Sequence, residues 1–186
     1  TMLPGGFSLA HRLDKDTSGA LLIAKNEETL EFLRKQFQER TVGKEYLCLV
    51  EGEIKKRGTI ETLLGRSPQD RRKQKVFLPG EPGAEGKREA KTEYRVKKNY
   101  LDYTFLEVTP RTGRKHQIRV HMQHLGHPIA GDRLYGFKNQ RIPEGLTRQF
   151  LHANSLSFAL PNGKRASVES LLPEELKLVL AKLATS

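Results

Sequence analysis

A carboxylate in a polar loop directly before an apolar segment is the clearest candidate for chemistry in this sequence. Asp14 stands in the stretch HRLDKDTSG at residues 11–19, and the apolar segment 20–24 follows at once. Small polar residues let the backbone turn, and a buried strand after them would fix the position of the carboxylate. The arrangement suits a nucleophile or a proton-transfer group. An aspartate before a strand is also a common turn former, and Asp16 competes with Asp14 for either role.

Three other groups of residues could contribute to such a site. Tyr46 lies in an alternating apolar segment, either as a core tyrosine or as a ring presented to a ligand. Arg71, Arg72 and Lys73 belong to a basic run in a long stretch rich in glycine and proline, where they either face solvent or contact phosphates. Four histidines within 116–127 lack the spacing of a zinc-binding helix and have no cysteine nearby, which favours polar helix surface over metal binding.

The charge balance indicates a polyanionic partner. Of 186 residues, 33 are lysine or arginine and 22 are aspartate or glutamate, which gives a net charge of +11. A globular domain of this charge is typical of proteins that bind nucleic acid. The single cysteine, Cys48, cannot form an internal disulfide. No apolar run approaches the roughly 20 residues of a membrane helix, so we expect a soluble, cytoplasmic protein that contacts no membrane.

Hydrophobic periodicity predicts a mixed α/β domain with a largely antiparallel sheet to position these residues. Strands are predicted at residues 20–25, 44–50, 76–78, 92–96, 103–108, 149–160 and 165–170. Helices are predicted from Asn26 to Gly43, around 118–125 with Gly126 as the end, and after Pro173. The first strand is apolar throughout, which indicates burial on both faces in the middle of a sheet. The triplet Pro4-Gly5-Gly6 predicts a turn before it.

Three sequence blocks in combination resemble the RluA, RluC and RluD type of pseudouridine synthase. They are HRLDKDTSGALLIAK at 11–25, GKEYLCLVEGE at 43–53 and TPRTGRKHQIRVHMQHLGHPIAGDRLYG at 109–136, supported by FLHANSLSF at 150–158. With the strands between them, the resemblance covers nearly the whole chain. It implies an α+β pseudouridine synthase fold, with a largely antiparallel central sheet flanked by helices.

Family members usually carry further strands, and often an S4-type RNA-binding domain, ahead of the first block. Here only ten residues precede His11. We therefore expect residues 1–186 to be a catalytic domain that lacks its usual N-terminal strands and any S4-type domain. We also expect a monomer.

The resemblance implies roles for the matching positions. Asp14 matches the catalytic aspartate, Tyr46 the tyrosine that stacks on the target base, and Arg119 the arginine that pairs with the aspartate. Arg12 matches the residue that fills the gap left by the flipped base, and Ile118 an apolar wall of the pocket. The expected substrate-binding residues are Arg12, Ile118, His11, Arg71, Arg72 and Lys73.

These roles fit the chemistry of the reaction. Converting uridine to pseudouridine breaks the N-glycosidic bond, turns the uracil and rejoins it through carbon, so the base must leave the stack. Stacking on Tyr46 and insertion of Arg12 into the vacated space would offset that cost. Asp14 must be ionised to act as a nucleophile or to start the proton loss, and a neighbouring Arg119 would favour its charged form. Tyr46 could also act in the proton transfer that completes the reaction.

The expected substrate is RNA, most specifically large-subunit ribosomal RNA, because the excursion that begins at Gly65-Arg66-Ser67-Pro68 is similar to the subgroup acting on it. An isomerisation needs no metal, nucleotide or redox cofactor, and we expect none. One alternative is a catalytically silent RNA-binding or ribosome-assembly module of the same fold. Another is a metal-dependent nuclease or hydrolase that uses Asp14, Asp16 and the histidines.

Overall fold

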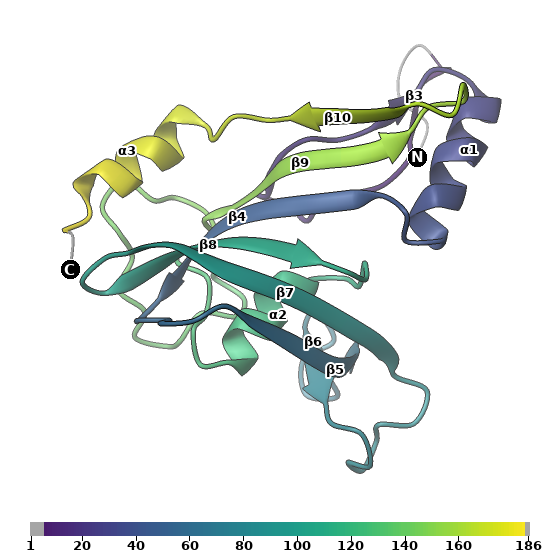
Figure 1. The fold of residues 1–186 in the computed structure, drawn as a ribbon. Helices are drawn as coiled ribbons and strands as arrows, with labels where there is room; N and C mark the ends of the chain where they lie inside the picture. The colour runs from purple at the N-terminus through teal and green to yellow at the C-terminus, as the bar shows by residue number, and fades with distance from the viewer. Residues whose placement is uncertain (1–5, 185–186) are drawn as a thin grey trace.

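A twisted, mostly antiparallel sheet forms the body of the protein (Figure 1). The computed structural model describes residues 6–184. Within these residues the strands are β1 (Ser8–Leu9), β2 (Ser18–Gly19), β3 (Ile23–Ala24), β4 (Gly43–Glu51), β5 (Gly58–Arg66), β6 (Gln74–Phe77), β7 (Arg88–Asn99), β8 (Tyr103–Pro110), β9 (Leu151–Ala159) and β10 (Arg165–Glu169). The helices are α1 (Glu27–Gln38), α2 (Gln117–His124) and α3 (Glu174–Lys182).

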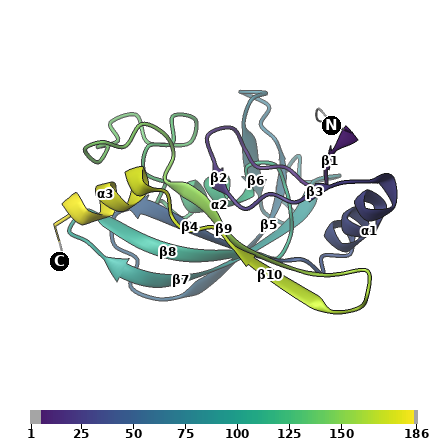
Figure 2. The same ribbon diagram turned by 90° about the horizontal axis from the view of Figure 1, so that it is seen from above.

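Seven strands follow one another across the sheet in the order β10-β9-β4-β8-β7-β5-β6, and each neighbouring pair is antiparallel. The eighth, β2, pairs in parallel with the start of β9, while β1 and β3 form a separate two-stranded ribbon. Figure 2 shows this N-terminal segment running alongside β9, although the two are far apart in the sequence. The predicted fold class, α+β with a largely antiparallel sheet, is confirmed.

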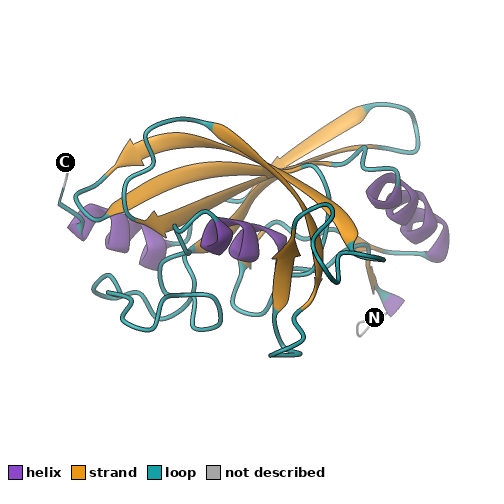
Figure 3. Ribbon diagram, turned by 90° about the horizontal axis from the view of Figure 1, so that it is seen from below, coloured by secondary structure: helices purple, strands orange, loops and turns teal. Residues whose placement is uncertain are grey.

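The main core lies against the two central strands. β8 is buried along most of its length because it lies between β4 and β7, and Leu106 and Val108, which share one face of the strand, are fully buried. Figure 3 shows α2 and α3 on the same face of the sheet, and α1 beyond the end of the sheet opposite α3. Met122 of α2 and Leu176 of α3 are also fully buried in this core. None of the helices between residues 6 and 184 is long and apolar enough to span a bilayer.

The first predicted helix is confirmed, but its end is not where the sequence placed it. Asn26 caps α1, since its Oδ1 accepts a hydrogen bond of 2.8 Å from the backbone N–H of Thr29. The chain leaves the helix at Arg40, which adopts a left-handed φ of 61°. Gly43 instead begins β4. A Cβ at Gly43 would lie 2.3 Å from the hydroxyl oxygen of Ser157, so the glycine permits close packing of β4 on β9.

The prediction of a central, doubly buried strand at 20–25 was wrong. Only residues 23–24 of this segment form a strand, which pairs with β1 in the separate ribbon, and side chains on one side of the segment face solvent. Leu21 is 38% exposed and Ile23 47% exposed, whereas Ala24 is buried. The N-terminal segment joins the main sheet earlier, at Gly19, which pairs with Ala153. A Cβ added to Gly19 would lie 2.2 Å from the carbonyl oxygen of Ala153, so only a glycine permits this close approach. The apolar composition therefore reflects packing against α1 rather than a place inside the sheet.

The remaining predicted elements are confirmed. The strands at 44–50, 92–96, 103–108, 149–160 and 165–170 correspond to β4, β7, β8, β9 and β10, and the edge strand at 76–78 corresponds to β6. The helix after Pro173 is α3. The helix around 118–125 is α2, and Gly126 follows it with a φ of 82°. The predicted turn at Pro4-Gly5-Gly6 lies outside the described residues except for Gly6.

Candidate active site

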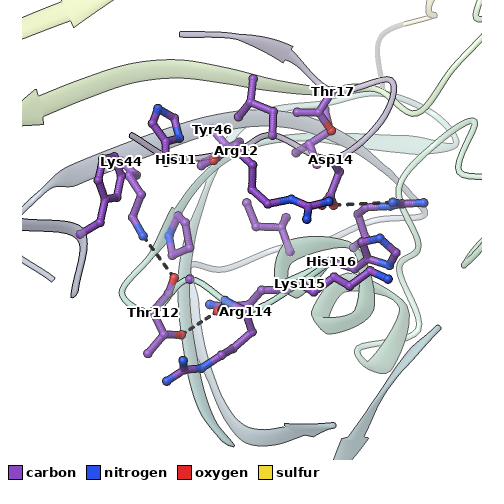
Figure 4. A pocket seen from close by; sticks show the side chains of 18 residues that line it. His11, Arg12, Asp14, Thr17, Lys44, Tyr46, Thr112, Arg114, Lys115 and His116 are labelled. Carbon is purple, nitrogen blue, oxygen red and sulfur yellow. Dashed lines mark hydrogen bonds and ion pairs between the residues drawn. The ribbon is translucent and has the colours of Figure 1, made fainter. Parts of the chain in front are cut away.

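A pocket of about 360 Å³ opens where segments from the first quarter of the chain meet segments from its middle (Figure 4). Its wall is formed by the loop before β2, the end of α1, the start of β4, the loop after β8 and the start of α2. This volume is in the range of small-molecule sites. The pocket brings together these predicted site residues: His11, Arg12, Asp14, Tyr46, Ile118 and Arg119.

Of the two candidate aspartates in the 11–19 loop, Asp14 faces the pocket. Its side chain is 18% exposed. Asp16 is exposed and adopts a left-handed φ of 66° in a turn closed by a hydrogen bond of 3.1 Å from the N–H of Thr17 to the carbonyl of Asp14. Asp16 therefore shapes the turn, and Asp14 is the carboxylate available to a ligand.

Two residues just before β9 hold this loop in place. The Gln149 side-chain amide donates to the carbonyl of Lys15 at 2.7 Å and to the hydroxyl of Thr17 at 3.1 Å. The Arg148 guanidinium donates to the carbonyl of Asp16 at 3.0 Å. The loop that carries Asp14 is thus fixed by residues more than a hundred positions away. The sequence contains no local signal for these contacts.

Arg119 pairs with two carboxylates, and the closer one is Asp132. Its Nε lies 2.7 Å from Oδ2 of Asp132 and its Nη2 lies 2.8 Å from Oδ1, a bidentate pair in which both side chains are buried. Its Nη1 lies 3.6 Å from Oδ2 of Asp14. Asp132 was missed by sequence reasoning. A usable signal existed, because it is the only acidic residue between Glu107 and Glu144 and so the only nearby partner in sequence for a buried arginine.

Several contacts keep the Asp132 carboxylate charged and the guanidinium in position. Burial alone would raise the pKa of Asp132, but the hydrogen bonds from Arg119 and from the backbone N–H groups of Leu134 and Tyr135 lower it below its usual value. The Tyr135 ring lies 5.2 Å from the Arg119 guanidinium. The Tyr135 hydroxyl lies 2.9 Å from Nδ1 of His116. Arg119 therefore presents one fixed positive charge to Asp14.

Tyr46 is a pocket residue rather than solely a core tyrosine. The ladder between β4 and β9 shifts register between Glu45 and Tyr46, a local irregularity that redirects side chains. Burial, together with the nearby charge of Asp14, raises the pKa of Tyr46 to about 12. The phenol is consequently neutral at neutral pH and can donate a hydrogen bond.

His11 and its neighbours form another part of the pocket wall. Nε2 of His11 accepts a hydrogen bond of 3.0 Å from the N–H of Leu22, and its ring stacks on Phe37 with centroids 4.6 Å apart. Burial, and then the charge of Lys44, lower the pKa of His11 to about 4, so the ring is neutral. Ile118 is buried, and Arg12 is exposed.

The prediction that the histidines of 116–127 lie on a polar helix surface was wrong for His121. This side chain is fully buried, with Nε2 lying 3.0 Å from the hydroxyl of Thr62 and Nδ1 lying 2.8 Å from the hydroxyl of Thr92. Both ring nitrogens are satisfied, which makes the burial tolerable. Across residues 6–184, no three histidine, cysteine, aspartate or glutamate side chains are grouped so as to hold a metal ion.

Buried His121 should make the protein less stable in mild acid. Burial, followed by the charge of His124, lowers its pKa to about 4. Because the folded pKa lies below the unfolded value of about 6.5, its contribution to the free energy of unfolding is complete above pH 6.5. That contribution is lost as the pH falls towards 4, by up to about 3 kcal/mol.

Denaturant unfolding between pH 7 and pH 4.5 checks this expectation. His121→Gln should show a flatter loss of stability with falling pH than the unaltered chain. His124→Gln changes an exposed residue of the same helix and should keep most of the original slope, because burial of His121, and not the charge of His124, is the larger cause of the lowered pKa. Parallel curves for all three proteins would show that His121 does not titrate as described.

Arg71, Arg72 and Lys73 lie outside the pocket, in the turn between β5 and β6. Arg72 forms an exposed pair of 2.8 Å with Asp70. Hydrogen bonds from Arg72 lower the pKa of Asp70 to about 2. The structure therefore does not bring this basic run together with the other predicted site residues.

Solved structures with the same fold define the class of protein. Human RNA pseudouridylate synthase domain containing 1 matches with a TM-score of 0.84 at 33% identity, covering 97% of this chain and 75% of that chain. Human RNA pseudouridylate synthase domain containing 4 shares the fold with a TM-score of 0.79 at 24% identity, covering 95% of this chain and 75% of that chain. The fold is that of pseudouridylate synthase domains.

The sequence identifies the family. Residues 4–124 match the family model described as RNA pseudouridylate synthase. A ribosomal large subunit pseudouridine synthase D from Nitrosomonas europaea is 39% identical over 178 residues, which are 92% of this chain and 50% of the relative. A ribosomal large subunit pseudouridine synthase C from Haemophilus influenzae is 39% identical over 185 residues, 96% of this chain and 55% of the relative. The chain belongs to the RNA pseudouridylate synthase family, as predicted, and spans about half the length of these curated relatives.

Proposed function

We propose that this chain is the catalytic domain of an enzyme that isomerises uridine to pseudouridine in RNA, and that its substrate is large-subunit ribosomal RNA. The observation that carries the proposal is the Asp14 carboxylate, which faces the pocket 3.6 Å from the buried Arg119 guanidinium. The printed names of relatives that act on the ribosomal large subunit support the choice of RNA. The net charge of +11 agrees with a polyanionic substrate.

The target base must leave the stack of RNA bases before it can enter the pocket. A pocket of about 360 Å³ has room for a uracil ring, and the half-buried Tyr46 and the buried Ile118 offer an aromatic and an aliphatic surface to it. Arg12 is exposed and lines the same pocket, where its long side chain can occupy the space that the base leaves. Stacking and this insertion together offset the few kcal/mol that extrusion of a base costs.

Asp14 is then the nucleophile. In the proposed reaction a carboxylate oxygen of Asp14 bonds to the ribose C1′ as the bond between C1′ and N1 breaks, and the uracil leaves with the electron pair of that bond. The uracil turns so that C5 faces C1′. The bond between C5 and C1′ then forms as the ester bond to Asp14 breaks, which regenerates the carboxylate, and the proton on C5 leaves while N1 gains one. Composition and oxidation state do not change, so the proposal includes no metal, nucleotide or redox cofactor.

Tyr46 serves chiefly as a neutral ring in this proposal. Replacing it with phenylalanine keeps the ring and should lower kcat/KM by less than about tenfold. Replacing it with leucine removes the stacking surface, which is worth about 1–3 kcal/mol per base, and should lower kcat/KM by about 10- to 100-fold. Steady-state kinetics on one RNA substrate measures both variants. Equal losses would indicate that the hydroxyl, and not the ring, is the functional group.

Nucleoside analysis tests the proposed function. Unmodified large-subunit ribosomal RNA is incubated with the protein, digested completely and separated by chromatography. The proposal expects a product with the mass of uridine and a different retention time. Uridine without this product would reject the proposed reaction, and shortened RNA chains on a gel of the sample taken before digestion would favour a nuclease.

The basic run at 71–73 has a separate place in the proposal. Its cations, of which Arg71 and Arg72 are exposed and Lys73 is half-buried, lie on a turn outside the pocket, where they can contact RNA phosphates beyond the target nucleotide. Such contacts would position the RNA without reading its sequence.

A further inference from the structure

The pocket has two chemically different ends. Figure 4 shows Asp14 and His116 toward one side and Lys44, Thr112 and Arg114 gathered at the other. The Asp14 end contains the pairing of a carboxylate with Arg119 that was described above. The other end is basic, and the proposed reaction gives it no role.

The two cations at the basic end are held by carbonyl groups instead of carboxylates. Nζ of Lys44 donates to the carbonyl of Thr112 at 3.3 Å, and Nε of Arg114 donates to the carbonyl of Glu89 at 2.9 Å. Among the ion pairs within residues 6–184, neither cation has a partner. Further N–H groups on both side chains therefore remain to bind a ligand.

Other positive charges lie close to this pair. Burial lowers the pKa of Lys44, and the charges of Arg40 and Arg114 lower it further. Burial also lowers the pKa of Arg114, followed by the charges of Arg88 and Arg40, against a smaller opposite effect of the Glu89 charge. Like charges crowd this half-buried wall and no carboxylate is paired with Lys44 or Arg114, so the wall has a positive potential that a bound anion would relieve.

The loop that carries Arg114 is fixed before any ligand binds. The buried Gln117 accepts hydrogen bonds through Oε1 from the Thr112 hydroxyl at 2.7 Å and from the Arg114 N–H at 3.0 Å. Its amide nitrogen donates to the hydroxyl of Thr92 on β7 at 2.9 Å. The backbone at both 112 and 114 is thereby attached to the core, which limits the entropy lost on binding.

We propose that Lys44 and Arg114 form a phosphate subsite that binds the sugar–phosphate backbone of the RNA strand whose uridine enters the pocket. This inference rests on the proposed function, because that function brings an RNA strand to the pocket. An ammonium and a guanidinium suit a phosphodiester, whose two non-bridging oxygens share one negative charge and can each accept a hydrogen bond. The subsite positions the strand and carries no sequence information.

The salt dependence of binding to an oligouridylate tests the subsite. Lys44→Gln and Arg114→Gln should each weaken binding and reduce the slope of log affinity against log salt by about 0.7 to 1, because each removes about one phosphate contact. Lys56→Gln removes one exposed charge from the loop at the far end of β4 and is the matched control, with the slope unchanged. Lys44→Arg and Arg114→Lys keep the charge and should keep most of the slope, which separates a lost contact from a damaged fold.

The outcomes distinguish the subsite from the reaction. The subsite would be overturned if the unaltered chain did not bind the oligouridylate. It would also be overturned if Lys44→Gln and Arg114→Gln gave the same slope as Lys56→Gln. Reduced slopes for these two variants support it, whether or not the unaltered chain forms pseudouridine. Reduced slopes without any pseudouridine in the nucleoside analysis would leave the subsite standing and reject the proposed function.

Discussion

Replacing Asp14 with asparagine is expected to lower the rate of pseudouridine formation by a factor of about 10⁴ or more while RNA binding persists. Asparagine has nearly the same shape but lacks the charge and nucleophilicity of a carboxylate. Because the loop is held by Gln149 and Arg148 through backbone carbonyls, the substitution should leave its position intact. Single-turnover assays with enzyme in excess measure the chemical step directly.

Asp16→Asn is the matched control for this variant. Asp16 lies two positions away in the same turn, is exposed and does not line the pocket. Asparagine also tolerates the left-handed φ of 66° at this position. Its rate should stay within about threefold of the unaltered chain, an effect under 1 kcal/mol. Comparable losses in both variants would place the defect in the loop as a whole and not in the Asp14 carboxylate.

Replacing Asp132 with alanine should have the largest effect on stability, lowering the free energy of unfolding by about 3–5 kcal/mol. The change leaves the buried Arg119 guanidinium without its bidentate partner, and only the longer contact of 3.6 Å to Asp14 remains. Urea unfolding at neutral pH measures the loss. Because the folded pKa of Asp132 is lowered, its contribution is fully present above about pH 4 and disappears only as the pH falls below that value.

Two further variants show where the loss arises. Glu144→Gln breaks an exposed pair with Lys182 and should not measurably change stability. Asp132→Leu combined with Arg119→Met removes both charges and should recover part of the stability lost in Asp132→Ala, although not activity. A double variant as unstable as the single one would contradict the view that an unpaired buried charge causes the loss.

Local patterns were sufficient to predict most elements of the fold. α1 was predictable because a capping Asn26 precedes an apolar stripe, and the hairpin of β7 and β8 because alternating residues flank a short turn. The segment 20–25 was not, because an apolar composition does not distinguish the middle of a sheet from an edge ribbon packed on a helix. Its position depends on pairing with β9, which is remote in the sequence.

The candidate site shows the same division between local and long-range information. Asp14, Tyr46 and Arg119 were predicted from sequence blocks, and they line one pocket; their catalytic roles stay predictions. Gln149 was missed because its importance arises from contacts that only the folded chain creates, whereas Asp132 was missed although its isolated position among basic residues was a usable signal. The burial of His121 was missed for a related reason, since the hydroxyl groups that form hydrogen bonds with its ring come from two strands that are distant from α2 in the sequence.

The most direct measurement is tritium release from ribosomal RNA labelled at carbon 5 of its uracil rings. The label leaves this carbon only when the new bond to the ribose forms, so release reports the proposed reaction itself. We expect the unaltered chain to release tritium from unmodified large-subunit ribosomal RNA, in proportion to the pseudouridine formed. Binding of that RNA with no release above background would contradict the assignment of this pocket as the site of uridine isomerisation.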